Sequence, residues 1–192
     1  MDLKSINPYV YAMWDEYRTL GPDYYQETSP KTLAEIEAEA GAKLPEDYKE
    51  FALEYSCFDA IPRAGTDLFY CAFPNQAMIM YTSCLTPHGA SILQSMRSLR
   101  RPHPVEPDVT LRLPDGVVPF NAGRGHSTIM LDLRPATHGQ VLFLDEIKVQ
   151  NFGTPGYDWD NVGWVAKTYT DFLRGLGTEE ELVARYHVPV KS

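Results

Sequence analysis

The sequence predicts an α+β fold in one domain, in which a mainly antiparallel β-sheet is flanked by amphipathic helices. Apolar residues recur at helical spacing towards both ends of the chain, whereas residues 113–150 hold short alternating runs that are typical of strands. A sheet and helices that each have an apolar face must pack together to bury both. With 192 residues, 44% of them hydrophobic, the chain can bury one such core. It shows no repeat and no clear linker, so we treat residues 1–192 as a single domain.

The first predicted helix spans residues 8–20. Its inner face carries Tyr9, Met13, Tyr17 and Leu20 at helical spacing. The Gly21-Pro22 pair is expected to end it, because neither residue favours continuation of a helix.

A pair of helices is predicted next, joined by the segment GAKLPEDYKEF. The first of them begins near Ser29 or Thr32, since Pro30 suits the first helical position and Thr32 with Glu35 has the spacing of a capping box. Gly41 is expected to take the left-handed conformation that closes this helix.

The second helix of the pair begins at Pro45, and Glu46 and Asp47 stand in its first turn, where the helix dipole favours negative charge. Its inner face carries Tyr48, Phe51, Ala52 and Tyr55. Residues 31–60 contain three Lys against six Glu and two Asp, a balance of −5. We therefore expect the outer faces of this helix pair to be strongly acidic.

Residues 67–112 combine strand-like and helical patterns. Short aromatic and apolar runs at 67–73 and 77–83 predict two strands, or a strand and an extended loop. A helix that ends at Arg101-Pro102 is marked by Ile92, Leu93, Met96 and Leu99. The proline-rich stretch that follows is expected to be an exposed loop.

The pattern from residue 113 onwards is that of a sheet. Residues 117–120 predict a short strand, and the NAGRG segment after it a turn. Residues 126–133 alternate between apolar and polar, which predicts a strand that is buried on one face only. Residues 141–144 are expected to form its antiparallel neighbour.

Two helices are predicted near the C-terminal end. One runs from about Asn161 to Leu176, and Thr178 caps a short last helix that extends to Tyr186. The apolar positions of the longer helix are Trp164, Val165, Tyr169, Phe172 and Leu173.

Composition excludes several classes of function. The net charge of −9 and the pI near 5.0 disfavour direct nucleic-acid binding and suit a basic protein partner. The three cysteines are odd in number and form no CxxC pair, which speaks against a disulfide framework or a zinc site. No run is apolar enough for a signal peptide or a membrane helix, so we expect a cytoplasmic protein.

Residues that could carry out catalysis or bind a metal are few. His126 and Asp132 lie about 20 Å apart along an extended strand, so they could not bind one ion without a bulge, and His138 could reach only one of them. There is no GxSxG nucleophile motif, and the GRG of residues 123–125 lacks the lysine and the strand–glycine–helix order of a nucleotide site. The acidic loop at 158–161 lacks the length, glycine and closing glutamate of a calcium site. We therefore expect no catalytic residues, no metal and no cofactor.

A loop bounded by Gly and Pro favours protein recognition. In it Tyr157 and Trp159 alternate with Asp158 and Asp160, and aromatic residues of this kind are enriched at interfaces. An anchoring role of Trp159 in the core is the alternative. The residues expected to bind a partner are Asp59, Asp132, Asp145, Glu146, Tyr157, Asp158, Trp159 and Asp160.

Three segments in this order resemble the SUKH superfamily, the SMI1/KNR4-like domains, in its bacterial toxin-immunity form. IEAEAGAKLPEDYKEFALEY resembles the family's helix, glycine joint, Leu-Pro and second helix. VVPFNAGRGHSTIMLDLRPATHGQVLFLDE resembles its strand, glycine turn, strand ending in Leu-Asp and next strand, and VAKTYTDFLRGL resembles its closing helix. The likeness covers residues 32–176, so residues 1–28 would be an N-terminal helical extension and residues 67–112 a longer insert than the family pattern has.

The chain also departs from the family pattern in two places. Ser56-Cys57-Phe58 stands where an Asn-Gly pair is common, and His126 stands where an acidic or amide residue is common.

The resemblance implies a non-enzymatic immunity protein that binds and neutralises a cognate bacterial toxin domain of a polymorphic toxin system. Such toxins are often nucleases with basic active sites, which an acidic face could occupy. The alternative that the resemblance implies is an intracellular scaffold or regulator that binds a host protein, as in fungal relatives. A third hypothesis is a hydrolase that uses His126 and Asp132.

Overall fold

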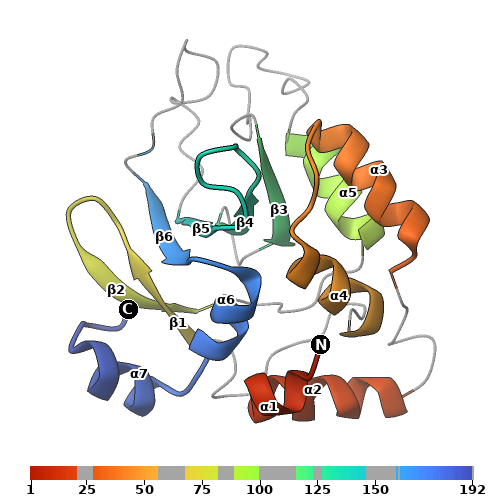
Figure 1. Ribbon diagram of the computed structural model, residues 1–192. Coiled ribbons are helices and arrows are strands. Elements are labelled where there is room, and N and C mark those ends of the chain that lie inside the picture. Colours follow the sequence, from red (N-terminus) through yellow and green to blue (C-terminus); the bar gives the residue numbers. More distant parts are fainter. Residues whose placement is uncertain are drawn as a thin grey trace.

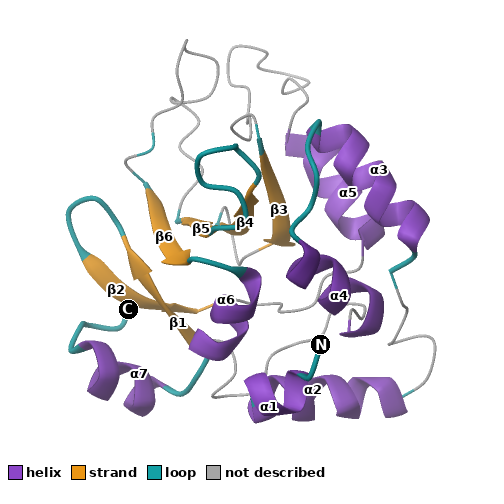
Figure 2. Cartoon of the chain, viewed as in Figure 1, coloured by secondary structure: helices purple, strands orange, loops and turns teal. Residues whose placement is uncertain are grey.

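The computed structural model describes residues 1–20, 28–55, 68–81, 89–99, 116–122, 127–145, 159 and 161–191. These residues form a single α+β domain, as expected, with the strands at the centre and the helices around them (Figures 1 and 2). The helices are α1 (Leu3–Ile6), α2 (Pro8–Thr19), α3 (Pro30–Ala40), α4 (Glu46–Tyr55), α5 (Gly89–Leu99), α6 (Tyr169–Gly175) and α7 (Glu179–Tyr186). The strands are β1 (Leu68–Ala72), β2 (Ala77–Tyr81), β3 (Val117–Ala122), β4 (Thr128–Asp132), β5 (Val141–Leu144) and β6 (Val162–Ala166).

All six strands form one antiparallel sheet in the order β2-β1-β6-β5-β4-β3. The strands predicted near residues 67–73 and 77–83 are confirmed as a hairpin, and the pairing of β4 with β5 is confirmed as well. The segment 67–112, expected to be an insert, therefore supplies two strands of the sheet and α5.

The main core lies between the helices and one face of the sheet. Its centre is aromatic: the ring of Tyr169 in α6 lies 5.1 Å from that of Phe51 in α4 and 5.2 Å from that of Phe120 in β3, between ring centroids. A second, smaller cluster covers the opposite face of β3 to β6, with Leu99 and Trp159 packed against it. The buried residues of this cluster are Val117, Met130, Leu142, Leu144 and Val162.

The expectation that the strand at 126–133 is buried on one face only is wrong. Every residue of β4 is buried, because the main core covers Ile129 and Leu131 while the second cluster covers Met130 on the other face. The alternating pattern predicted a solvent-facing side because Thr128 and Asp132 are polar, but both residues are buried.

The helix predicted from Asn161 to Leu176 is also wrong in its first half. Residues 162–166 form β6, which pairs with β5 and, at one position, with β1. Only residues 169–175 are helical, and the Thr168 side chain caps that helix by accepting from the backbone N–H of Asp171. The apolar run fitted a helical period, but pairing with β5 on one side keeps its first five residues extended.

Most other helix boundaries agree with the sequence. Gly41 ends α3 in the left-handed conformation, with φ 70°, and the four inner positions predicted for α4 are buried. Of the two starts predicted for α3, the one at Ser29 is confirmed: Pro30 takes the first helical position, and the Ser29 hydroxyl accepts from the Thr32 backbone N–H. Glu35 pairs with Lys31 instead of closing a capping box. No helix among the described residues is both long and apolar enough to cross a membrane.

The N-terminal helices are part of the main core. Leu3, Val10 and Met13 are at most 1% exposed within it. The inner face predicted for α2 is wrong at Tyr9 and Leu20, which are 46% and 52% exposed. The buried Asn7 links α2 to α6: its Oδ1 accepts from the backbone N–H groups of Tyr9 and Val10, and its Nδ2 donates to the carbonyls of Leu173 and Leu176. The helices of residues 1–20 thus pack against the rest of the fold.

Candidate functional site

The described parts of the three segments that carry the family resemblance contact one another in the fold. In the joint before α4, the Lys43 carbonyl lies 2.8 Å from Nε2 of His138, and Pro45 packs against Gly139 in the turn after β4. The Asp47 carboxylate, one residue into α4, accepts from both the backbone N–H and the hydroxyl of Thr170 in α6. These contacts position the helix pair against the sheet, so the shared motifs account for the scaffold.

Asp132 at the end of β4 is fully buried, with 0% of its surface exposed. Its carboxylate accepts from the backbone N–H, Nε and Nη2 of Arg134 and from the hydroxyl of Thr137. Burial opposes its ionisation, but these hydrogen bonds outweigh burial and hold the pKa of Asp132 below its ordinary value. Asp132 therefore organises the turn between β4 and β5 and presents no surface of its own.

Arg134 carries this arrangement to the surface. Its guanidinium, held by Asp132, stacks 4.2 Å from the centroid of the Trp159 ring, and its side chain is 40% exposed. Trp159 also packs, partly buried, against the second apolar cluster, so it has part of the anchoring role in the core that was the alternative to partner binding. A planar cation held on an aromatic ring over an apolar base has the character of a binding hot spot.

Asp145, another predicted partner residue, pairs with Lys191 near the C-terminal end, and its carbonyl accepts from the hydroxyl of Ser127. Of the eight predicted partner residues, the structure thus describes Asp132, Asp145 and Trp159. The other five, Asp59, Glu146, Tyr157, Asp158 and Asp160, lie outside the described residues and stay predictions.

The residues considered for catalysis do not come together where the structure describes them. Among the described residues, no three His, Cys, Asp or Glu side chains could hold a metal ion together. His138 contacts the Lys43 carbonyl, Asp132 is occupied by Arg134 and Thr137, and His126 lies outside the described residues. Cys71 is buried, which raises the pKa of its thiol and disfavours the reactive thiolate.

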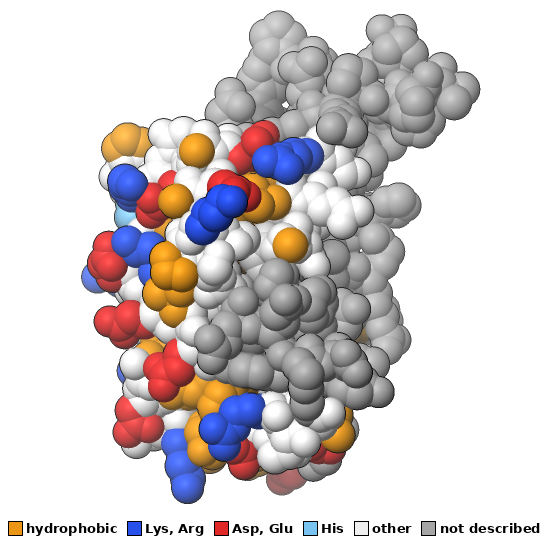
Figure 3. Space-filling model, turned by 90° about the vertical axis from the view of Figure 1, so that its right-hand side faces the viewer, with side chains coloured by type: hydrophobic (Ala, Val, Ile, Leu, Met, Phe, Trp, Pro, Cys, Tyr) orange, Lys and Arg blue, Asp and Glu red, His pale blue; other side chains and the backbone are white. Residues whose placement is uncertain are grey.

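The acidic helix pair has internal cationic partners. On α3, Glu37 pairs with Lys43 at 2.6 Å and Glu39 with Arg97 at 3.5 Å, and on α4 Glu46 pairs with Lys49 at 2.5 Å. Acidic and basic side chains are accordingly interspersed on the face that Figure 3 shows. The Glu37 carboxylate is held in place, since it is only 12% exposed and also accepts from the Leu44 backbone N–H, whereas Glu46 is 84% exposed and its pair is weak. The charge of this face is therefore less one-sided than the sequence predicts.

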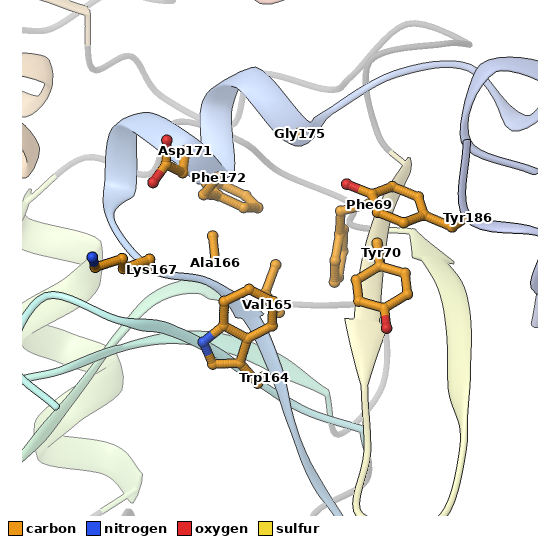
Figure 4. A pocket seen from close by; sticks show the side chains of 10 residues that line it. All are labelled: Phe69, Tyr70, Trp164, Val165, Ala166, Lys167, Asp171, Phe172, Gly175 and Tyr186. Atoms are coloured by element: carbon orange, nitrogen blue, oxygen red, sulfur yellow. The ribbon is translucent and has the colours of Figure 1, made fainter.

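A cleft that the sequence does not predict opens where β1 and β6 separate. Its volume is about 280 Å³, and it is lined by aromatic residues from both strands, from α6 and from α7 (Figure 4). The exposed Trp164 forms one wall. The sequence did not predict this cleft because it predicted a helix over 161–176, in which Trp164 would not face β1.

Comparison with known proteins gives one family. The model of the SMI1 / KNR4 family (SUKH-1) matches residues 27–175, which is more than half of the chain. No curated protein matches the chain significantly.

Proposed function

Because the chain belongs to the SMI1/KNR4 family (SUKH-1), we propose that it is an immunity protein that binds and neutralises a cognate bacterial toxin domain by direct contact. The family match over residues 27–175 is the observation that carries this proposal. In this role the protein acts in the cytoplasm, performs no reaction of its own and needs no cofactor or metal.

The surface around Arg134 and Trp159 supports the proposal as one contact region. Arg134 is pre-ordered by the buried Asp132, so little side-chain freedom is lost when a partner covers it. We place the predicted partner residues Asp145, Glu146, Tyr157, Asp158 and Asp160 in the same contact region because they flank Trp159 or β5 in the sequence. We propose Asp59 as a further contact.

Charge supports a basic toxin, such as a nuclease. The chain has a net charge of −9, so long-range attraction would raise the association rate with a basic partner. Such steering weakens as salt screens the charges, over a Debye length of about 10 Å at 0.1 M ionic strength.

The test is co-expression with the toxin domain encoded next to this protein. Growth should be rescued, the two proteins should co-purify, and the association rate should fall between 50 and 500 mM salt (on the order of a tenfold fall). Absence of both rescue and complex contradicts the proposal. A complex with a host protein in the absence of any neighbouring toxin gene would favour the scaffold or regulator instead.

A further inference from the structure

The cleft between β1 and β6 exists because the two strands touch at one end only. Their single paired position is Ala72 with Trp164. There Gly163 lies against Cys71, so closely that a Cβ on Gly163 would overlap the Cys71 sulfur. At its other end β1 leaves β6: Leu68 forms a bridge with Gly177, whose backbone N–H donates to the Leu68 carbonyl at 3.1 Å. The two strands therefore diverge from the Ala72–Trp164 pair, and the cleft is the space between them.

The walls of the cleft are aromatic and held in place. Phe69 and Phe172 at its base are each 1% exposed and pack edge to face, with ring centroids 6.1 Å apart. On the α7 side Tyr70 and Tyr186 stack with centroids 4.3 Å apart. Trp164 faces them across the opening and is 42% exposed (Figure 4). An exposed Trp beside packed aromatic rings is the composition of a hot-spot pocket.

The size of the cleft indicates what it can hold. A cavity of about 150 Å³ accommodates a benzene ring, whereas small-molecule sites usually measure about 300–1,000 Å³. At about 280 Å³ the cleft lies at the lower limit of that range, and it has room for one large apolar side chain of a partner.

A positively charged side chain that has no partner among the described residues lies at one end of this cleft (Figure 4). Lys167, at the junction of β6 and α6, is the one Lys or Arg among the described residues for which the structure gives neither a carboxylate within 4.0 Å nor an aromatic ring beneath it. The carboxylate nearby, Asp171, is occupied by Arg174 at 2.6 Å. The end of the cleft therefore attracts an anionic group, although the chain as a whole is acidic.

We propose that this cleft is a docking site for a partner segment in which a large apolar side chain stands next to an Asp or Glu. The apolar side chain enters between Trp164 and Tyr70, and the carboxylate pairs with Lys167. This inference rests on the proposed function in one respect, namely that the partner is the cognate toxin. It adds a second contact point, which lies between β1 and β6 and so towards the opposite end of the strand order from β3. This contact point selects a partner by shape and by a single charge.

Two variants with matched controls test the site. Trp164→Ala removes a wall of the cleft, and Tyr81→Ala is its control, since Tyr81 is 47% exposed but does not line the cleft. Lys167→Glu reverses the free charge, and Lys31→Glu makes the same charge change on the exposed surface of α3. Each test variant should weaken toxin binding at least about tenfold, while each control changes it less than about threefold. Thermal unfolding of all four variants checks that the fold is kept.

A second probe separates this inference from the proposed function. The capped dipeptide Ac-Phe-Asp-NH2 should shift the Trp164 indole signal in ¹H–¹⁵N spectra saturably, and Ac-Phe-Lys-NH2 and Ac-Ala-Asp-NH2 should do so much less. If the toxin binds wild type and all variants alike, the docking site is wrong and the immunity function stands. If no toxin binds, the dipeptides decide: a selective shift supports the site, and equal shifts or none overturn it.

Discussion

The carboxylate of Asp47 accepts a 2.8 Å hydrogen bond from the backbone N–H of Thr170 and a 3.1 Å bond from its hydroxyl, across 123 residues of sequence. Thr170 stands in the first turn of α6, where backbone N–H groups have no partner within the helix. Asp47, which follows Leu-Pro-Glu in the chain, thus caps α6 from the neighbouring helix α4. This acidic residue therefore stabilises the fold.

Asp47→Asn should lower the free energy of unfolding by about 1–2 kcal/mol, because the amide accepts more weakly at the end of α6 and loses the favourable charge there. Urea unfolding measures the change. Glu46→Gln is the control, since Glu46 is 84% exposed and pairs only with Lys49 among the described residues. An equal loss for both variants would contradict the capping role.

Asn7→Ala should cost about 2–3 kcal/mol, because it removes the cap of α2 and the side-chain amide that donates to the Leu173 and Leu176 carbonyls. The same residue lies outside the family match, so a fragment that begins at residue 27 should fold poorly. Circular dichroism of that fragment checks the second expectation. A stable, cooperatively folded fragment would show that α1 and α2 are dispensable.

Asp132→Asn should lower stability at pH 7 by at least about 2 kcal/mol, since a buried charge-assisted pair with Arg134 is lost. The pH dependence has a definite sign. The folded pKa of Asp132 lies below the unfolded value near 3.8, so the unfolded state binds the proton first as pH falls. The stabilisation is complete above about pH 5 and is lost as pH falls through the folded pKa. Unfolding measured from pH 7 to pH 2 should therefore show a steeper acid loss for wild type than for the variant.

Gly163→Ala should destabilise the protein by about 1–3 kcal/mol, because the added Cβ would overlap the Cys71 sulfur and press on Phe73. Adding Cys71→Ala should recover part of the loss, since the sulfur is then absent. A double-mutant cycle from chemical denaturation measures this coupling. Purely additive effects would mean that Cys71 does not restrict the position.

Trp159→Ala should weaken toxin binding by about tenfold or more if the surface at Arg134 is a contact region, because it removes the ring on which Arg134 stacks. Arg97→Ala on α5 is a suitable control, since Arg97 is 53% exposed and lies on another part of the surface. Isothermal titration calorimetry measures the affinity. An unchanged affinity of the Trp159 variant would show that the toxin binds at another surface.

Local signals were enough for most elements. The helix pair joined by Gly41 and Pro45, the final helix capped by Thr178 and the hairpin of β1 and β2 each depend on residues close together in the chain. Turn and cap chemistry of this kind acts over three or four residues and is therefore visible in a single sequence. The three motifs of the family resemblance belong to the same class, and the family match agrees with them.

Tertiary structure alone decided the rest. Whether Val162–Ala166 became strand or helix depended on an edge of β5, about twenty residues away, that could accept it. The burial of Asp132 and the aromatic cleft beside Trp164 likewise depend on which distant segments meet. The sequence by itself determined the class of fold, the family and the local elements, because those follow from neighbouring residues. The surfaces open to a partner could only emerge on folding, because packing and strand pairing over long separations select which side chains stay exposed.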